Sequence, residues 1–239
     1  MPKPAALITG GAKRIGQAIS LSLAQLGFDI ALHYNRSRKE AENTASQIRK
    51  TGVHCEIFKA DLENGRETLA LIAKVSRRFP KLSLLVNSAS IFKKSKLTTD
   101  NLKLFNMHFS INFKAPYILS CDFAKICKSG QIINILDTHI TTSKTTYPAY
   151  LLSKKLLGEF TSLAALQFAP KIRVNAIAPG LILAPAAKDE TYLKRLAQNI
   201  PLKKRGNPTN ITHAIQFLLE NGYVSGQTIF IDGGEHLLS

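Results

Sequence analysis

The sequence predicts an α/β fold, with a single doubly wound parallel sheet of about seven strands and helices on both faces. Short apolar runs alternate with amphipathic segments along the whole chain, and the first run, residues 5–9, is followed by a glycine turn and helical spacing. Such alternation is typical of parallel strands joined by right-handed crossovers. No tandem repeat, low-complexity tract or linker interrupts it, so we expect one domain over residues 1–239.

The composition allows a sizeable core and carries a large positive charge. Of the 239 residues 45% are hydrophobic, and 32 Lys and Arg against 16 Asp and Glu give a formal net charge of +16. Such a charge attracts polyanions, but the basic residues are scattered and not interleaved with aromatic side chains. We expect a solvated, lysine-rich surface that steers anionic ligands, and no nucleic acid as the main partner.

The chain carries no pattern typical of export or membrane insertion. No apolar run reaches the roughly 18 residues that a membrane helix needs, and strand-like sequence from Ala5 onward leaves no room for a signal peptide. We therefore expect a cytoplasmic protein without a membrane partner. The cysteines lack metal-ligand spacing with any histidine and are expected to be reduced thiols: Cys55, Cys121 and Cys127.

A glycine turn joins the first strand to the first helix. The run 5–9 stops at Gly10 and Gly11, and apolar residues then recur at helical spacing as far as Gly27. Such a turn lets the backbone approach a pyrophosphate, for which the helix N-terminus offers free N–H groups and a positive dipole end. In this strand–turn–helix context, the turn predicts a Rossmann-type dinucleotide site rather than a merely structural turn. Its candidate residues are Gly10, Arg14, Ile15 and Gly16.

The end of the second strand, residues 29–34, indicates which dinucleotide is bound. An NAD enzyme usually places an acid there against the ribose 2′-hydroxyl, but this strand ends without one, in His33, Tyr34, Asn35, Arg36 and Ser37. A planar cation and a hydroxyl suit a 2′-phosphate, and Arg14 could add a second cation. We therefore expect NADPH as the cofactor; the plainer alternative makes Arg36 an ordinary loop cation.

The third strand, residues 55–59, follows a helix over residues 38–50 and also ends in candidate cofactor contacts. Asp61 and Leu62 stand just past its end, where an acid can hold the adenine amino group and an apolar side chain can cover the ring.

The fourth strand, residues 82–86, delivers four small residues to its carboxyl end: Asn87, Ser88, Ala89 and Ser90. They leave room for a cofactor or make a tight turn. Phe92 follows, and its aromatic ring either stacks on a flat substrate or belongs to the core.

The next segment, residues 102–128, is predicted as one long helix with Pro116 inside it. Proline has no N–H to give to the carbonyl of Asn112, four residues earlier. That carbonyl is then free to hold water, as one station of a proton relay if the helix passes behind Lys154; the alternative is a packing kink.

The fifth strand, residues 132–136, leads to a helix with Tyr150 and Lys154 one turn apart on the same face. An ammonium beside a phenol favours the phenolate, so we expect Lys154 to lower the Tyr150 pKa. Asp137 lies thirteen positions before Tyr150, and a loop of that length can fold its carboxyl back toward the phenol. The alternative is a chance pairing on a surface helix.

The last two strands, residues 172–178 and 228–231, end at the same edge of the predicted sheet. After the first of them we expect Leu181 to face the substrate and three neighbours to face the cofactor, namely Pro179, Gly180 and Ile182. Residues 183–201 fit a mobile helical lid.

Five motifs together resemble the short-chain dehydrogenase/reductase family over nearly the whole chain. They are Thr9-Gly10-Gly11-Ala12-Lys13-Arg14-Ile15-Gly16, Asn87-Ser88-Ala89, Tyr150-x-x-x-Lys154, Pro179-Gly180 and Asp232-Gly233-Gly234. Within the family the chain looks most like the pteridine reductases and dihydromonapterin reductases, through Arg14, residues 33–37, the run ending at Phe92, and Asp137 where most members have serine. Asn87-Ser88 departs from the usual Asn-Asn.

This resemblance implies a catalytic set of Asn112, Asp137, Tyr150 and Lys154. It also implies that Arg14 and Ser90 contact the cofactor and the pterin, and that Phe92 lies against the pterin ring opposite the nicotinamide. The expected activity is NADPH-dependent reduction of a pteridine, with Tyr150 as the proton donor. An NADPH-dependent carbonyl reductase, acting on a 3-oxoacyl thioester or another small ketone, is the alternative, and a non-catalytic NADP sensor or nucleic-acid binder is a third.

The helix that carries Tyr150 also suggests an oligomer. Leu151, Leu157 and Leu166 are expected to point away from the active face and to pair helices between subunits. A homotetramer, common in the family, is expected.

Overall fold

Seven parallel strands form one sheet in the computed structural model, which describes residues 3–143, 146–183 and 190–238. Their order across the sheet is β3-β2-β1-β4-β5-β6-β7, so the predicted fold class is confirmed. In chain order they are β1 (Ala5–Ile8), β2 (Asp29–Tyr34), β3 (Cys55–Lys59), β4 (Leu82–Asn87), β5 (Gly130–Ile135), β6 (Ile172–Pro179) and β7 (Thr228–Ile231). The order reverses between β1 and β4, and such a switch point opens a crevice at the carboxyl ends of the strands.

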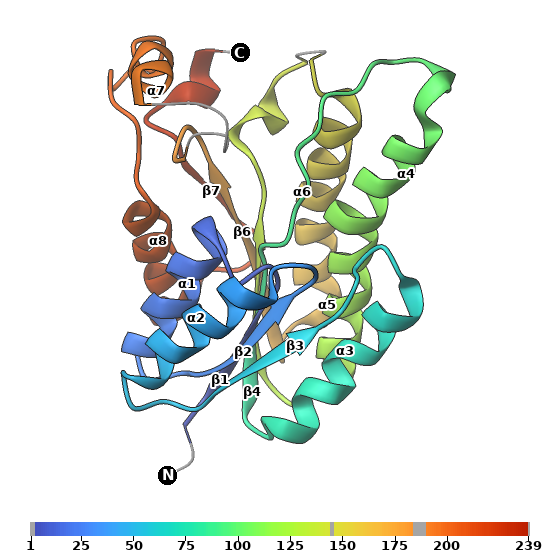
Figure 1. The fold of residues 1–239 in the computed structure, drawn as a ribbon, viewed down its shortest axis with the longest axis vertical. Helices are drawn as coiled ribbons and strands as arrows, with labels where there is room; N and C mark the ends of the chain where they lie inside the picture. Colours follow the sequence, from blue (N-terminus) through green and yellow to red (C-terminus); the bar gives the residue numbers. More distant parts are fainter. Residues whose placement is uncertain (1–2, 144–145, 184–189, 239) are drawn as a thin grey trace.

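Helices cover both faces of this sheet (Figure 1). One face carries α1 (Arg14–Gln25), α2 (Arg38–Arg49) and α8 (Pro208–Glu220). The other carries α3 (Gly65–Arg78), α5 (Ala115–Ile126) and α6 (Pro148–Phe168), with α4 (Leu102–Phe109) against α6. At the top of Figure 1, α7 (Glu190–Ala197) and the short 3-10 helix η4 (Glu235–Leu238) lie beyond the carboxyl ends of the strands. Within the described residues, no helix combines the length and the apolar character of a membrane span.

Successive residues of the central strands point into two separate cores. Leu7 packs toward α3, α5 and α6, whereas Ile8 packs toward α1, α2 and α8, and neither has any exposed surface. A strand covered on both faces has no solvent side, so its sequence is a continuous apolar run. For this reason the predicted strand 29–34 coincides with β2, and the predicted strand 82–86 differs from β4 by one residue.

The long helix predicted over residues 102–128 contains an irregular turn. Between α4 and α5, residues Ser110–Lys114 form a π-helix, in which the Ala115 N–H donates to the Ser110 carbonyl, five residues earlier instead of four. Pro116 stands in the first turn of α5. It has no N–H to donate to the carbonyl four residues earlier, so the regular α-helical hydrogen bonding is interrupted there. The proline therefore follows a widened turn, and not the simple kink that we expected.

In the described part of the predicted lid, residues 183 and 190–201, α7 is the helix. Its Leu193 and Ala197 are buried. Residues 184–189 lie outside the described part of the chain.

Two of the three leucines proposed for subunit contacts are buried inside the chain itself. Leu157 has no exposed surface and packs in the core between the sheet and α6, and Leu151 is only 7% exposed. Leu166 is 80% exposed, and Leu163, one turn earlier, is 66% exposed. A helix-paired contact through α6 would therefore use Leu163 and Leu166, and not Leu151 and Leu157.

Candidate active site

The loop after β5 brings the carboxyl group of Asp137 to the phenol of Tyr150. Asp137 caps a 3-10 turn, η3 (Thr138–Thr141), by accepting the His139 backbone N–H at 2.8 Å. Tyr150 lies in the first turn of α6, which begins at Pro148, and its hydroxyl donates to Asp137 Oδ2 at 2.7 Å. The structure thus brings together the acid and the phenol that the sequence separates by thirteen positions.

Lys154 lies one helical turn beyond Tyr150 and is almost fully buried. Its Nζ donates to the Ile135 carbonyl at 2.7 Å and lies 6.0 Å from the centre of the Tyr150 ring. Burial lowers the pKa of Lys154 to about 8, although the charge of Asp137 opposes this shift. The end of β5 therefore holds the ammonium group at a distance from the phenol.

The pKa of Tyr150 is raised well above 10, and the expectation that Lys154 lowers it is wrong for this structure. Burial withdraws the phenol from water, and Asp137 adds a negative charge and a hydrogen-bond acceptor that favour the neutral form. Asp137 accepts the hydroxyl hydrogen directly at 2.7 Å, whereas Lys154 Nζ donates to the Ile135 carbonyl. Tyr150 therefore keeps its proton, which is the state that a proton donor needs.

The glycine turn forms a narrow cradle before α1. Gly10 has a φ of 64°, and a side chain on Gly16 would meet the Gly10 carbonyl oxygen at 2.2 Å. The Thr9 hydroxyl ties this turn to the end of β4 by accepting the N–H groups of Ser88 and Ala89 at 2.9 and 3.0 Å. Helix α1 has no side-chain cap and no acid in its first turn, which suits an anion at its N-terminus.

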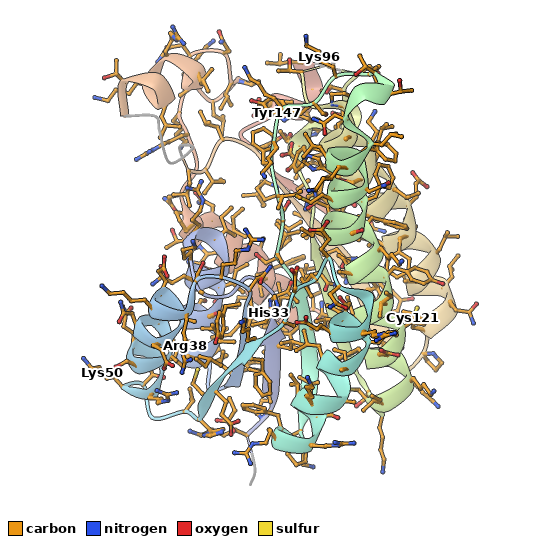
Figure 2. The ribbon with its side chains drawn as sticks, turned by 45° about the vertical axis from the view of Figure 1, so that its right-hand side comes forward. His33, Arg38, Lys50, Lys96, Cys121 and Tyr147 are labelled. Atoms are coloured by element: carbon orange, nitrogen blue, oxygen red, sulfur yellow. The ribbon has the colours of Figure 1, made fainter. Side chains whose placement is uncertain are left out.

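His33 supports this turn from within the molecule, where Figure 2 labels it. The Gly10 N–H donates to His33 Nδ1 at 3.0 Å, so Nε2 carries the ring hydrogen and donates to the Ala60 carbonyl at 3.0 Å. Burial lowers the pKa of His33 to about 4. Tyr34 is buried in the core beside α1 and α2. Both residues were predicted to bind the cofactor; because β2 is covered on both faces, their side chains serve the turn and the core, and a cofactor contact there would have to come from the backbone.

The loop after β2 keeps polar groups at the surface. Asn35 donates to Asp61 Oδ1 at 3.1 Å and so joins the ends of β2 and β3. Arg36 is exposed and Ser37 is half-buried. Leu62, next to Asp61, is largely buried in the core.

Two of the predicted cofactor residues have structural side chains. Asn87 is buried, and its amide donates to Asn134 Oδ1 at 2.9 Å and to the Ser120 hydroxyl at 3.3 Å, which links β4, β5 and α5. Ile182 is also buried, in the core next to α8. Cofactor contacts at these two positions stay a prediction, and they would have to come from the backbone.

Arg14 and the loop after β6 approach each other across the crevice. The guanidinium of Arg14 donates to the Leu183 carbonyl at 3.5 Å. Gly180, in the same loop, lies so close to the Asp232 backbone that a side chain would meet it at 2.7 Å. Leu181 follows and is half-buried.

Asn112 anchors the loop after β4, a side-chain role that the sequence did not suggest. Its Oδ1 accepts the Ile91 N–H at 2.9 Å and the Ser90 hydroxyl at 3.1 Å, and its Nδ2 donates to the Ile91 carbonyl at 3.1 Å. His108, one turn earlier, contacts the Lys93 carbonyl through Nε2 at 3.2 Å. The available signal in the sequence was the spacing of His108 and Asn112, two polar residues four positions apart on one face of a helix. A part for the Asn112 backbone carbonyl in proton transfer stays a prediction.

An exposed aromatic ring stands beside the Asp137–Tyr150 pair. Phe92 is 53% exposed, meets Tyr150 edge-on at 4.7 Å between ring centres, and stacks on Tyr147 at 4.2 Å. Figure 2 shows Tyr147 at the same end of the molecule as Lys96. Sequence reasoning missed Tyr147, although it lies three residues before Tyr150. The two rings form an aromatic wall that a flat, partly apolar ligand can cover.

Comparison with known proteins identifies relatives along the whole chain. Residues 10–236 match a family model described as enoyl-(acyl carrier protein) reductase. The chain is 30% identical over 243 residues to a 3-oxoacyl-[acyl-carrier-protein] reductase, FabG, from Staphylococcus epidermidis, with 97% of this chain and 98% of that protein covered.

Two solved structures share the fold at higher identity. FolM alternative dihydrofolate reductase 1 from Brucella canis, complexed with NADP, superposes with a TM-score of 0.91 and 36% identity, covering 98% of this chain and 94% of that chain. The protein of the same description from Brucella suis, also in complex with NADP, gives a TM-score of 0.93 and 35% identity, covering 98% and 95%.

Proposed function

Since the chain belongs to the short-chain dehydrogenase/reductase family, we propose that it uses NADPH to reduce a pteridine, from the dihydropterin to the tetrahydropterin level. The similar solved structures are described as dihydrofolate reductases complexed with NADP, and dihydrofolate contains a pterin ring, which supports both parts of the proposal.

The observation that carries the proposal is the carboxylate of Asp137 at the phenol of Tyr150. Its pKa is lowered: burial opposes ionisation, but the hydrogen bond and charge of His139, the Tyr150 hydroxyl and the His139 N–H outweigh burial. An anion here accepts N–H groups, which nitrogen heterocycles such as pterins carry. It repels the oxyanion that develops when a ketone is reduced, so a heterocycle suits this site better than a carbonyl does.

The charge and shape of the cofactor site also fit NADPH. The glycine turn has no room for a side chain at Gly16, so a pyrophosphate there would meet backbone N–H groups. Helix α1 begins beside it with Arg14, Ile15 and Gly16. Arg36 and Ser37 would hold the 2′-phosphate, with Asn35 and Asp61 toward the adenine. Lys154 would hold the nicotinamide ribose, and the backbone at residues 87–89 and 179–182 would border the nicotinamide. The bound nicotinamide supplies a hydride.

Tyr150 supplies the proton. In the structure its hydroxyl points at Asp137 Oδ2. A substrate N–H that donates to that oxygen would replace the phenol there and free the O–H to turn toward the ring nitrogen being reduced. The Tyr150 O–H bond then breaks as the new N–H bond forms. Phe92 would cover one face of the substrate ring, and Ser90, Arg14 and Leu181 would border it.

The second candidate, an NADPH-dependent carbonyl reductase, is favoured by one observation. The curated relatives of similar length include 3-oxoacyl-[acyl-carrier-protein] reductases at 30–31% identity. In that case Asp137 would be a variant of a serine that donates to the carbonyl oxygen.

The decisive experiment follows NADPH oxidation with dihydrobiopterin or dihydromonapterin, and separately with acetoacetyl thioester, for wild type, Asp137→Ser and the control Asp122→Ser. Asp122 is a half-exposed acid on α5, away from Tyr150. We expect the wild type and the control to reduce only the pterin, and Asp137→Ser to lose about a hundredfold in kcat. Thioester turnover that survives or improves with serine would instead establish the carbonyl reductase.

A further inference from the structure

The carboxylate of Asp137 is held by its neighbour two residues on. His139 contributes two donors to the same oxygen, Oδ1: its backbone N–H at 2.8 Å and its imidazole Nδ1 at 2.7 Å. The other oxygen, Oδ2, is left to Tyr150 at 2.7 Å. One carboxylate oxygen is therefore fixed from behind, and the other is presented to the reacting groups.

The far side of the imidazole faces further charged groups. His139 Nε2 lies 3.5 Å from Glu235 Oε1 of η4. His236 of the same turn lines a cavity of about 130 Å³ with His139 and Glu235. The Asp232 carboxylate, after β7, accepts hydrogen bonds from the Thr138 hydroxyl and from His236 Nδ1. From α6, the Tyr150 hydroxyl donates to Asp137, and Lys154 Nζ donates to the Ile135 carbonyl.

Glu235 is the acid that would orient the imidazole. The imidazole Nε2 faces the Glu235 carboxylate and Nδ1 faces the Asp137 carboxylate, so the ring lies between two anions. An imidazole in that position donates to Asp137 while remaining anchored on η4. The C-terminal turn thereby supports a carboxylate that belongs to the loop after β5.

We propose that His139 is a positioning and specificity-determining residue, whose imidazole keeps Asp137 ionised and turned toward Tyr150 so that the site accepts N–H-bearing heterocycles in preference to ketones. This inference rests on the proposed function. In this inference His139 acts through Asp137, to which both of its donors bond.

The charge at Asp137 would follow the imidazole. Without the Nδ1 donor, burial of Asp137 is opposed by fewer hydrogen bonds, so its pKa rises. A protonated Asp137 donates rather than accepts, which weakens binding of a substrate N–H and relieves repulsion of a developing oxyanion. The selectivity between pterin and ketone would then fall as the pH is lowered.

The test compares His139→Leu, His139→Asn and the control His213→Leu. Asparagine carries an amide Nδ2 where histidine carries Nδ1, so it can still donate to Asp137 without an imidazole ring. His213 is an exposed histidine on α8. Steady-state reduction of dihydropterin and of acetoacetyl thioester is measured across the pH range, together with the melting temperature of each variant.

We expect His139→Leu to lower kcat/KM for the pterin about tenfold and to move the acid limb of its pH profile upward by about one unit, as loss of a hydrogen bond to a charge implies. The ratio of pterin to thioester turnover should fall with it. His139→Asn should stay within about threefold of wild type, and His213→Leu should match wild type.

An unshifted acid limb in a folded His139→Leu, or an equal loss in His139→Asn, would overturn the inference and leave the proposed function standing. A wild type that reduces the thioester and not the pterin would overturn both.

Discussion

At the scale of single residues, burial decides which form each ionisable group takes. His33, Tyr150 and Lys154 are all removed from water, and each is shifted toward its neutral form. Asp137, in the same site, is shifted the other way, because enough donors surround it to keep it charged. The site thus combines a neutral phenol with a neighbouring anion.

His33 predicts a measurable pH dependence of stability. Its pKa is about 4 in the folded chain and 6.5 in the unfolded chain, so below about pH 6.5 the unfolded chain binds more protons, and stability is lost as the pH falls to about 4. Between about pH 7 and pH 4, the free energy of unfolding of wild type should fall by roughly 3 kcal/mol more than that of His33→Asn. Denaturant titration at several pH values measures this difference.

A comparison of variants separates the two functions of His33. Asparagine can still accept the Gly10 N–H through its side-chain oxygen, whereas leucine cannot. We expect KM for NADPH to rise about tenfold in His33→Leu and to change little in His33→Asn. Equal values of KM in the two variants would mean that the glycine turn does not depend on this bond.

The residue pairs could be predicted from the sequence only in part. The spacing of Asp137 and Tyr150 allowed their contact, but the direction of the Tyr150 pKa shift depended on which charge lies closer. The sequence placed both the Lys154 ammonium and the Asp137 carboxylate within reach of the phenol. The hydrogen bonds decide between them, because the Tyr150 hydroxyl donates to Asp137 Oδ2 at 2.7 Å while Lys154 Nζ donates to the Ile135 carbonyl.

At the scale of elements, the column formed by α4, the π-helix and α5 holds the side of the site that carries Phe92. Asn112 lies in the π-helix, and besides the loop after β4 it donates to the Ser153 hydroxyl on α6 at 3.2 Å. Ser153 in turn donates to the Tyr150 carbonyl. One side chain thus connects the loop that carries Phe92 with the helix that carries Tyr150.

Asn112→Ala should therefore impair the substrate site more than the cofactor site. Removing the amide leaves the Ile91 N–H without its partner, at a cost of about 1–3 kcal/mol in the free energy of unfolding. We expect KM for the pterin to rise about tenfold while KM for NADPH changes little. Steady-state kinetics with each substrate varied in turn measures both constants.

Asn106→Ala is the matched control, since Asn106 is an exposed asparagine on α4. It should leave stability and both KM values near those of wild type. A rise in KM for NADPH as large as that for the pterin in Asn112→Ala would argue against a role confined to the substrate side.

Elements were predicted well where burial is uniform and less well where the backbone departs from regular bonding. Strands such as β2 are covered on both faces, so their apolar runs have sharp ends. The π-helix has no such signal: residues 102–126 keep helical composition, and Pro116 marks an irregularity without specifying its type.

At the scale of the whole molecule, the exposed apolar side chains of α6 predict self-association. Leu163 and Leu166 are 66% and 80% exposed, and burying such side chains against a second copy would be favourable. The predicted homotetramer should lose this contact in the double variant Leu163→Glu and Leu166→Glu, and light scattering should report a smaller particle.

Leu69→Glu provides the control for that experiment, because Leu69 is 56% exposed on α3, away from α6. Its particle size should equal that of wild type. A wild-type monomer at micromolar concentration would contradict the prediction of an oligomer.

The net charge of +16 also acts at this scale. NADPH is an anion, and a positively charged protein attracts it over distances comparable to the Debye length. We expect kcat/KM for NADPH to fall as salt rises from about 0.01 M to about 1 M, while kcat stays nearly constant. A salt-independent kcat/KM would show that the charge has no part in steering the cofactor.

The bond network of Asn112 has one more consequence, for the range of substrates. Because a single amide holds both the loop of Phe92 and the helix of Tyr150, the aromatic wall and the proton donor are pre-organised, and the conformational entropy of setting their spacing is lost on folding and not on ligand arrival. We therefore expect the site to favour planar rings over bulky saturated ones.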